Sequence, residues 1–168
     1  MTSGDAIVLS AVVAGAGTAS VVDVLHRRIP NAISFATAAA GITLAATGAS
    51  GVTVASSLLG FALGCLMMLP GHVLGATGAG DVKLFAAVGA VIGAGQVVEA
   101  FLCVAIAGGV FAGGVAWWRG RFTRTIVHMG RLCGQPVRAR AAIESPREHN
   151  RFPYGPAIAV GCALAVLL

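Results

Sequence analysis

Long apolar runs separated by short polar breaks constrain this chain more than any other feature of its sequence. Only 10% of its 168 residues are charged, whereas soluble domains carry about 25%. Runs of about 20 apolar residues are long enough to cross the hydrocarbon core of a bilayer as helices. The predicted fold is therefore all-α, a polytopic membrane helix bundle that forms a single domain over residues 1–168. Six membrane-spanning helices are predicted, at residues 6–25, 32–49, 52–74, 82–97, 99–118 and 153–168.

The basic residues indicate how these helices are oriented in the membrane. Arg27 and Arg28 follow the first helix, Lys83 opens the fourth, and eight arginines fill the loop 119–151. Six helices place all eleven Lys and Arg residues on one face, whereas five or seven helices would divide them. Because basic residues collect on the cytoplasmic side, we expect both termini outside, the loop in the cytoplasm and the chain in the plasma membrane. The loop either anchors this topology against anionic lipid or helps to dock a substrate or partner.

Charge and cysteine usage argue against several other classes of protein. The net charge is +5, but no basic patch is interleaved with aromatic residues, so we expect no nucleic-acid partner. Asp5 stands where a secretory signal would be basic, so the first apolar run is expected to be a retained helix. The cysteines lack metal-site spacing, so we predict no disulfide, metal or cofactor. They are Cys65, Cys103, Cys133 and Cys162.

Glycines four residues apart recur in three of the apolar runs. They occur in GFALG, GAVIG and GVFAG, at residues 60–64, 89–93 and 109–113. Small residues let helices approach closely in lipid, so we interpret these pairs as packing sites. GATGAG, at residues 75–80, superficially resembles a dinucleotide loop, but no strand is predicted before it.

Two aspartates stand beside apolar runs at the same predicted face. Asp23 lies near the inner end of the first helix, and Asp81 lies at the inner start of the fourth. A carboxylate in a membrane helix is costly, so it indicates a functional site by default. The structural alternatives are an ion pair between Asp23 and Arg27, four residues on, and a capping role for Asp81. Glu99 falls at a predicted outer turn, where contact with solvent explains it.

Paired carboxylates can hydrolyse a peptide bond without a metal. Two neighbouring acids share a proton, so that one takes a proton from water while the other polarises an amide carbonyl. Gly78 and Gly80, just ahead of Asp81, permit an unusual turn and the close approach of an extended peptide. The helix dipole is expected to lower the pKa of Asp81, which makes Asp81 the base and Asp23 the proton holder in this hypothesis.

Three short motifs, spread along the chain, give the most specific signal. GAGD at residues 78–81 is followed by VKL, DVLHRRIPN occupies residues 23–31, and RFPYGPAIAVG occupies residues 151–161. They resemble the GxGD signature, the first aspartate segment and the closing Pro-Tyr-Gly motif of the type IV prepilin peptidases. The motifs and the six predicted helices extend this resemblance over nearly the whole chain. GxGD alone is less specific, since presenilin-type intramembrane proteases share it.

The resemblance implies an aspartic endopeptidase of the inner membrane, with Asp23 and Asp81 as the catalytic pair at the cytoplasmic edge. Such enzymes remove the short basic leader of a prepilin, cutting after a glycine just ahead of the hydrophobic helix of the pilin. The implied partners are a prepilin, membrane lipid and, as a further candidate, the pilus-assembly machinery. Substrate binding is expected around the first, fourth and sixth helices and the glycine-rich turn. The candidate residues are Gly78, Gly80, Lys83, Pro30, Asn31, Tyr154 and Gly155.

Departures from the family pattern narrow the resemblance and leave alternatives. Longer members carry an N-terminal region with paired CxxC motifs and also methylate the new N-terminus; the lack of CxxC here argues against N-methyltransferase activity. The short form most resembles the peptidases of Tad/Flp pilus systems, and archaeal preflagellin peptidases are similar in architecture. From other classes, a small proton-coupled transporter could use the aspartates as a relay, and a structural component of a secretion complex would leave them replaceable. A relay belongs near the bilayer midplane, whereas both aspartates lie near one edge.

Overall fold

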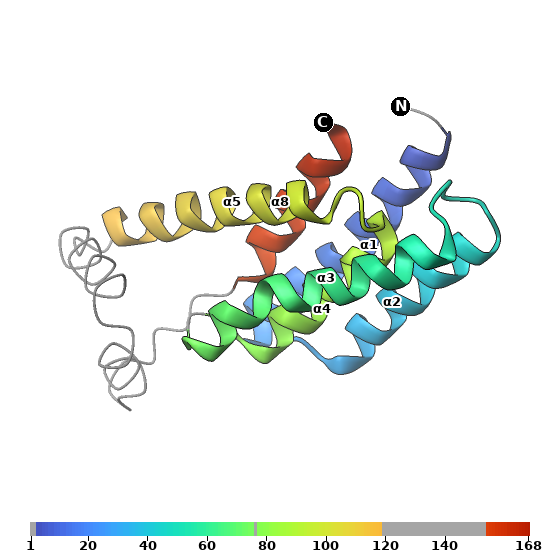
Figure 1. Cartoon of the computed structure of the whole chain (residues 1–168). Helices are drawn as coiled ribbons and strands as arrows, with labels where there is room; N and C mark the ends of the chain where they lie inside the picture. The colour runs from blue at the N-terminus through green and yellow to red at the C-terminus, as the bar shows by residue number, and fades with distance from the viewer. Residues whose placement is uncertain (1–2, 76, 119–153) are drawn as a thin grey trace.

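Six α-helices make up the part of the chain that the computed structural model describes, residues 3–75, 77–118 and 154–168, and no strand occurs in these ranges. Each predicted run corresponds to one helix, which confirms the all-helical prediction. The predicted cytoplasmic loop, residues 119–151, lies outside the described residues. The helices are α1 (Ser3–His26), α2 (Asn31–Ala46), α3 (Val54–Val73), α4 (Ala79–Ile92), α5 (Val97–Trp118) and α8 (Gly155–Leu167) (Figure 1).

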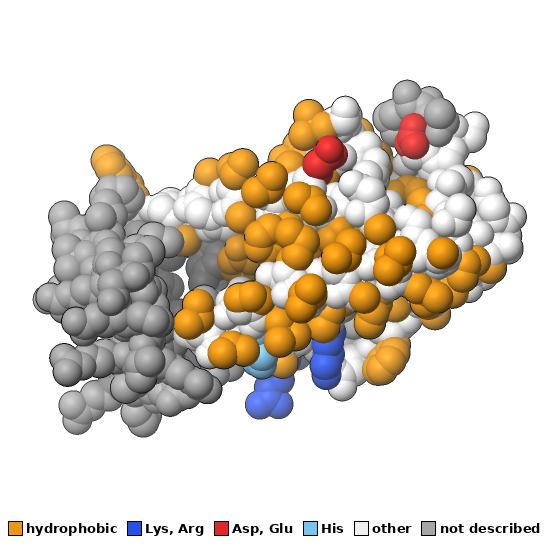
Figure 2. Space-filling view, viewed as in Figure 1, with side chains coloured by type: hydrophobic (Ala, Val, Ile, Leu, Met, Phe, Trp, Pro, Cys, Tyr) orange, Lys and Arg blue, Asp and Glu red, His pale blue; other side chains and the backbone are white. Residues whose placement is uncertain are grey.

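Three of the helices, α1, α3 and α5, are long and apolar enough to cross a bilayer, and α2 and α8 are shorter apolar helices. The chain is therefore a membrane protein. Figure 2 shows hydrophobic side chains over much of the visible face, with acidic side chains near its upper edge and basic side chains near its lower edge. This separation of charge suits a bundle whose apolar belt lies in lipid. Both termini lie at the upper end (Figure 1); six crossings and outside termini stay predictions.

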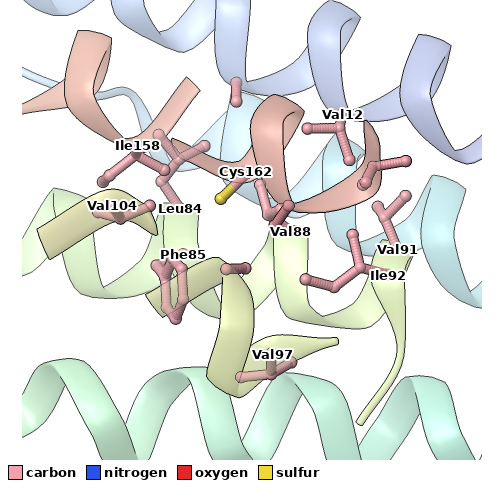
Figure 3. Packing of buried hydrophobic residues seen from close by; sticks show 14 of the residues in the cluster. Val12, Leu84, Phe85, Val88, Val91, Ile92, Val97, Val104, Ile158 and Cys162 are labelled. Atoms are coloured by element: carbon pink, nitrogen blue, oxygen red, sulfur yellow. The ribbon is translucent and has the colours of Figure 1, made fainter. Parts of the chain in front are cut away.

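Helix α4 runs through the middle of the bundle, in contact with α1, α2, α3 and α8. Residues 81–92 of this helix are buried, with the exception of Lys83. Its side chains form the centre of the hydrophobic core, where Leu84 and Val88 lie beside Cys162 of α8 (Figure 3). Because this short helix is enclosed by other apolar helices, the position of its first turn is fixed by its neighbours.

Small residues let α2 and α3 approach α4 closely. A Cβ on Gly60 of α3 would clash with the carbonyl oxygen of Gly89 of α4, and a Cβ on Gly89 would clash with that of Gly60. On the α2 side, a Cβ on Gly41 would stand 2.8 Å from the carbonyl carbon of Ala90. The Ser57 hydroxyl adds a hydrogen bond, donating to the Ala90 carbonyl oxygen over 2.7 Å. Close packing of this kind is a main source of attraction between helices in lipid.

The predicted packing role of the paired glycines is confirmed for α3, whereas the described residues give it no support for α5. Gly64 faces α4 as Gly60 does, since a Cβ on Gly64 would stand 3.1 Å from Cα of Ala86. A Cβ on Gly109 or Gly113 of α5 would meet nothing within 4 Å in the described part of the molecule. Equal spacing in the sequence therefore does not imply an equal role, because packing depends on which helix stands opposite.

Helix α4 is shorter than predicted. It ends at Ile92, ahead of the expected end at residue 97, because Gly93 adopts φ 78°, a left-handed conformation that glycine tolerates best. Ala94 then turns toward α3, where its N–H donates to the Ser56 hydroxyl oxygen over 3.0 Å. The second glycine of GAVIG thus ends the helix, and it also packs closely, since a Cβ there would stand 2.8 Å from Oγ of Ser56 and from Cγ1 of Val52.

Candidate active site

The end of α1 brings Asp23 to one end of the bundle and turns the chain toward α4. Asp23 is buried, with 7% of its surface exposed. The helix ends at His26, and Arg27 adopts φ 52° and donates its N–H to the Asp23 carbonyl oxygen over 2.7 Å. Ile29 then packs on the start of α4, where a Cβ on Gly80 would stand 3.1 Å from Cβ of Ile29. Two of the three sequence motifs therefore meet in space.

The start of α4 holds Asp81 through its own backbone. Gly78 is the N-cap residue, and its N–H donates to Oδ2 of Asp81 over 2.8 Å. A carboxylate at the third helical position commonly reaches back in this way to the free N–H at the cap. Only 8% of Asp81 is exposed. The expected capping role is therefore confirmed, and it leaves the second carboxylate oxygen for other contacts.

Asp23 is held from the other end of the chain. Gly155, the first residue of α8, donates its N–H to Oδ2 of Asp23 over 3.0 Å. The structural alternative, an ion pair between Asp23 and Arg27, is wrong for the described residues, in which Arg27 contacts Asp23 through its backbone. The described part of the third motif, which begins at Tyr154, thus joins the first two motifs at one end of the bundle.

The charges of the two carboxylates interact across this site. Burial raises the pKa of Asp81, which stands just ahead of the expected membrane run 82–97, from 3.8 to about 6. The hydrogen bond from Gly78 opposes this rise in pKa, the charge of Asp23 adds to it, and His72 counters it. The helix dipole alone predicts a lower pKa, but the removal of the carboxylate from water is the larger effect. Asp81 therefore binds a proton more readily than expected, which reverses the direction predicted for it.

Three of the predicted substrate-binding residues lie together beside α4. Pro30 is the N-cap residue of α2, and the exposed Lys83 donates from Nζ to Oδ1 of Asn31 over 3.0 Å. Pro30 and Asn31 also line a groove of about 430 Å³, which continues past Arg28 to Val22 of α1. Gly78 and Gly80 occupy the first turn of α4, next to this group. The remaining two, Tyr154 and Gly155, stand at the start of α8.

Sequence reasoning missed two contacts that hold this site. His72, at the end of α3, donates from Nδ1 to the Thr77 carbonyl oxygen over 3.1 Å and ties down the turn that precedes α4. Tyr154 packs its ring on α5, where a Cβ on Gly108 would stand 2.7 Å from Cζ of Tyr154. The five-residue separation of His72 and Thr77 is a signal that could have been used. Nothing in the sequence pairs Tyr154 with Gly108.

The arrangement suits acid–base chemistry on water. Two buried carboxylates interact, and each is fixed by one backbone N–H. A pair of this kind can keep one proton and accept another. Within the described ranges, no three His, Cys, Asp or Glu side chains gather into a set that could hold a metal ion.

Comparison with known proteins gives one match. Residues 7–113 match the family model of the type IV leader peptidase family. The matched residues include Asp23, Asp81 and the glycine-rich turn, and α8 lies beyond them. No curated protein matches the chain, and no solved structure does.

Proposed function

The chain belongs to the type IV leader peptidase family, and we propose that it is an aspartic endopeptidase with Asp23 and Asp81 as its catalytic pair. Family membership gives the coarse activity, that of a membrane protease with a prepilin-type substrate. The finer proposal is that the protein removes the short leader of a Tad/Flp-type prepilin, cutting after a glycine at the cytoplasmic edge of the plasma membrane. The basic residues next to both aspartates support the choice of side.

One observation carries the aspartic mechanism. Asp23 and Asp81 are both buried, their charges interact, and separate helices supply the N–H group that fixes each of them. A purely capping role accounts for one carboxylate at one helix start. It does not account for two interacting carboxylates at the same end of the bundle, because burying a second like charge beside the first is unfavourable.

The proposed reaction uses the pair as proton holder and base. Asp81 holds the shared proton, because burial raises its pKa, and donates a hydrogen bond to the carbonyl oxygen of the scissile peptide bond. Asp23 takes a proton from a water molecule, whose oxygen attacks the carbonyl carbon. The tetrahedral intermediate collapses when a proton passes to the amide nitrogen, which leaves as the amino terminus of the pilin. One water is consumed and no covalent enzyme intermediate forms.

The first turn of α4 and the adjoining groove are the proposed path of the leader. A peptide bond inside a helix is shielded by its own hydrogen bonds, so the scissile segment must be extended. Gly78 and Gly80 place backbone without side chains beside Asp81, where Ile29 and the Asp81 carboxylate approach it closely, and the extended segment is proposed to lie along this backbone. The groove lined by Pro30 and Asn31 begins next to this turn and accepts the residues ahead of the cut.

The test is a cleavage assay on purified protein in detergent. Wild type, Asp23→Asn and Asp81→Asn are incubated with a prepilin from the same genome, and the loss of the leader is followed by gel shift and mass spectrometry. General acid–base catalysis contributes about 10²- to 10⁴-fold to the rate. Each substitution is therefore expected to lower kcat by a factor of about 10² or more. Glu99→Gln is the matched control, because Glu99 is an exposed acid at the start of α5.

The pattern across the four proteins decides the proposal. Cleavage after a leader glycine by wild type and Glu99→Gln alone supports the assigned pair. Cleavage that survives either aspartate substitution would show that the paired-carboxylate mechanism is wrong. An absence of cleavage by folded wild type, repeated with a second prepilin, would remove the proposed substrate.

A further inference from the structure

We infer that Gly155 is a positioning residue, whose amide at the start of α8 holds the Asp23 carboxylate in the orientation that the reaction needs. The inference rests on the proposed function and deepens it. It assigns part of the active site to the last helix of the chain, which lies beyond the residues that match the family.

The hydrogen bond is buried and long-range. Gly155 and Asp23 are 132 residues apart, and their N–H to Oδ2 distance is 3.0 Å. The first N–H groups of a helix have no partner within the helix, so the Asp23 carboxylate satisfies a donor that α8 cannot satisfy itself. With Oδ2 directed to this amide, Oδ1 is the oxygen that remains for the attacking water. The bond therefore sets which face of the carboxylate meets the substrate.

The contact leaves little room for a side chain at position 155. A Cβ there would stand 3.0 Å from Oδ2 of Asp23, 3.1 Å from its Cβ and 3.2 Å from Cα of Ser20. The carboxylate oxygen could yield by rotation, but the other two atoms belong to the backbone and the first side-chain carbon of α1. Any larger residue must therefore move α8 away from α1 or turn the carboxylate, and either movement disturbs the geometry of Asp23.

Two further contacts hold α8 in place. Tyr154 packs on α5 at Gly108, and Gly161 packs on α5 with its Cβ position 2.5 Å from Cα of Val104. These contacts are on the α5 side, whereas the Gly155 amide points to α1. The side of α8 that faces α5 therefore serves packing, and the Gly155 amide, which faces α1, serves to position Asp23. Gly161 belongs to the packing side and lies farther along the helix than Gly155.

The experiment compares the same substitution at these two glycines of α8. Full-length wild type, Gly155→Ala and Gly161→Ala are purified in detergent, and kcat, KM and the thermal unfolding temperature are measured for each with the same prepilin. A misplacement of about 1 Å can cost about 10²-fold in rate, so Gly155→Ala is expected to lower kcat about 10- to 100-fold with KM nearly unchanged. Gly161→Ala, whose clash is with α5, is expected to lower the unfolding temperature at least as much but to lower kcat less than Gly155→Ala does.

The two roles predict different relations between rate and stability. If kcat falls in proportion to the unfolding temperature in both variants, Gly155 is a packing residue and the inference is overturned. Unchanged kcat in a folded Gly155→Ala protein overturns it as well. The proposed function fails separately, through activity that survives Asp23→Asn.

Discussion

The two aspartates are held by the same kind of bond in very different ways. Each carboxylate accepts one N–H from a glycine at the start of a helix. For Asp81 the donor is Gly78, three residues away in the same turn. For Asp23 the donor is Gly155, 132 residues away on another helix. One geometry is therefore made by a local turn, and the other by the packing of the whole bundle.

The difference teaches where each side of the site can be disturbed. The Gly78–Asp81 bond forms within the first turn of α4 when Gly78 is its N-cap residue. It therefore depends little on neighbouring helices. The Gly155–Asp23 bond exists only while α8 is packed between α1 and α5. A substitution that alters the packing between helices should therefore displace the Asp23 carboxylate more than the Asp81 carboxylate, unless it moves α4 itself.

The largest effect on stability is expected from a substitution that disrupts the close contact between α3 and α4. Gly89→Ala places a methyl group against the backbone of Gly60, which forces α3 and α4 apart and costs about 1–3 kcal/mol of stability. We expect a lower unfolding temperature and a lower yield of folded protein in detergent. Gly109→Ala is the matched control, because its Cβ meets nothing within 4 Å among the described residues, and its unfolding temperature should equal or exceed that of wild type. Equal losses in both variants would contradict the close α3–α4 contact.

A smaller effect is expected at the local bond. In Gly78→Ala the new Cβ would stand 3.1 Å from Oδ2 of Asp81. This oxygen ends a side chain that can rotate, and Gly78 keeps its N–H. The bond should weaken by about 0.5–1.5 kcal/mol, equivalent to a kcat about two- to tenfold lower.

Comparison with Gly155→Ala sharpens the contrast between the local and the long-range bond. Its loss of kcat should be the larger of the two, since two of the three atoms near its new Cβ cannot rotate away. Parallel kcat measurements on the two variants check this order. The reverse order would mean that Asp81, and not Asp23, is the more tightly constrained carboxylate.

The sequence predicts the helices well because lipid imposes a simple rule on it. Apolar runs of sufficient length identified all six helices, and the boundaries agree closely where a charged residue or proline marks the end, as at Pro30. The predicted boundary is wrong at the end of α4. The sequence alone does not distinguish a glycine with a left-handed backbone, such as Gly93, from a glycine inside a helix, such as Gly89.

The site was predictable only as far as its motifs are local. Asp23 and Asp81 could be assigned to one end of the bundle from topology alone, and the capping role of Asp81 follows from its position at a helix start. The contact between Gly155 and Asp23 could not be predicted, because it depends on the angle at which α8 crosses α1. Nor could the rise in the pKa of Asp81, since burial by neighbouring helices outweighs the dipole of its own helix.

The smallest expected effects concern the pH dependence of the reaction. Asp81 has its pKa raised to about 6, so it keeps the shared proton below that pH and loses it above. If the protonated form is the active one, kcat/KM should fall as the pH rises through about 6, because Asp81 then loses its proton. A series of kcat/KM values from pH 4.5 to 8, in one detergent and at constant ionic strength, measures this limb. A rise in kcat/KM across the same interval would make Asp81 the base and reverse the assignment.

Substitution of His72 is expected to shift the pH at which kcat/KM falls, because His72 affects the pKa of Asp81. Charge on the His72 ring lowers the pKa of Asp81, and its Nδ1 donates to the Thr77 carbonyl oxygen. His72→Asn keeps a donor nitrogen in reach of that carbonyl and removes the charge, so the limb should move to higher pH without a loss of maximal kcat. His72→Ala removes both the charge and the hydrogen bond and should also lower kcat, because the turn before Asp81 is released. If the pH at which kcat/KM falls is the same in His72→Asn as in wild type, the charge of His72 has no effect on Asp81. His72 would then act on Asp81 only through its hydrogen bond to Thr77, which holds the turn before α4.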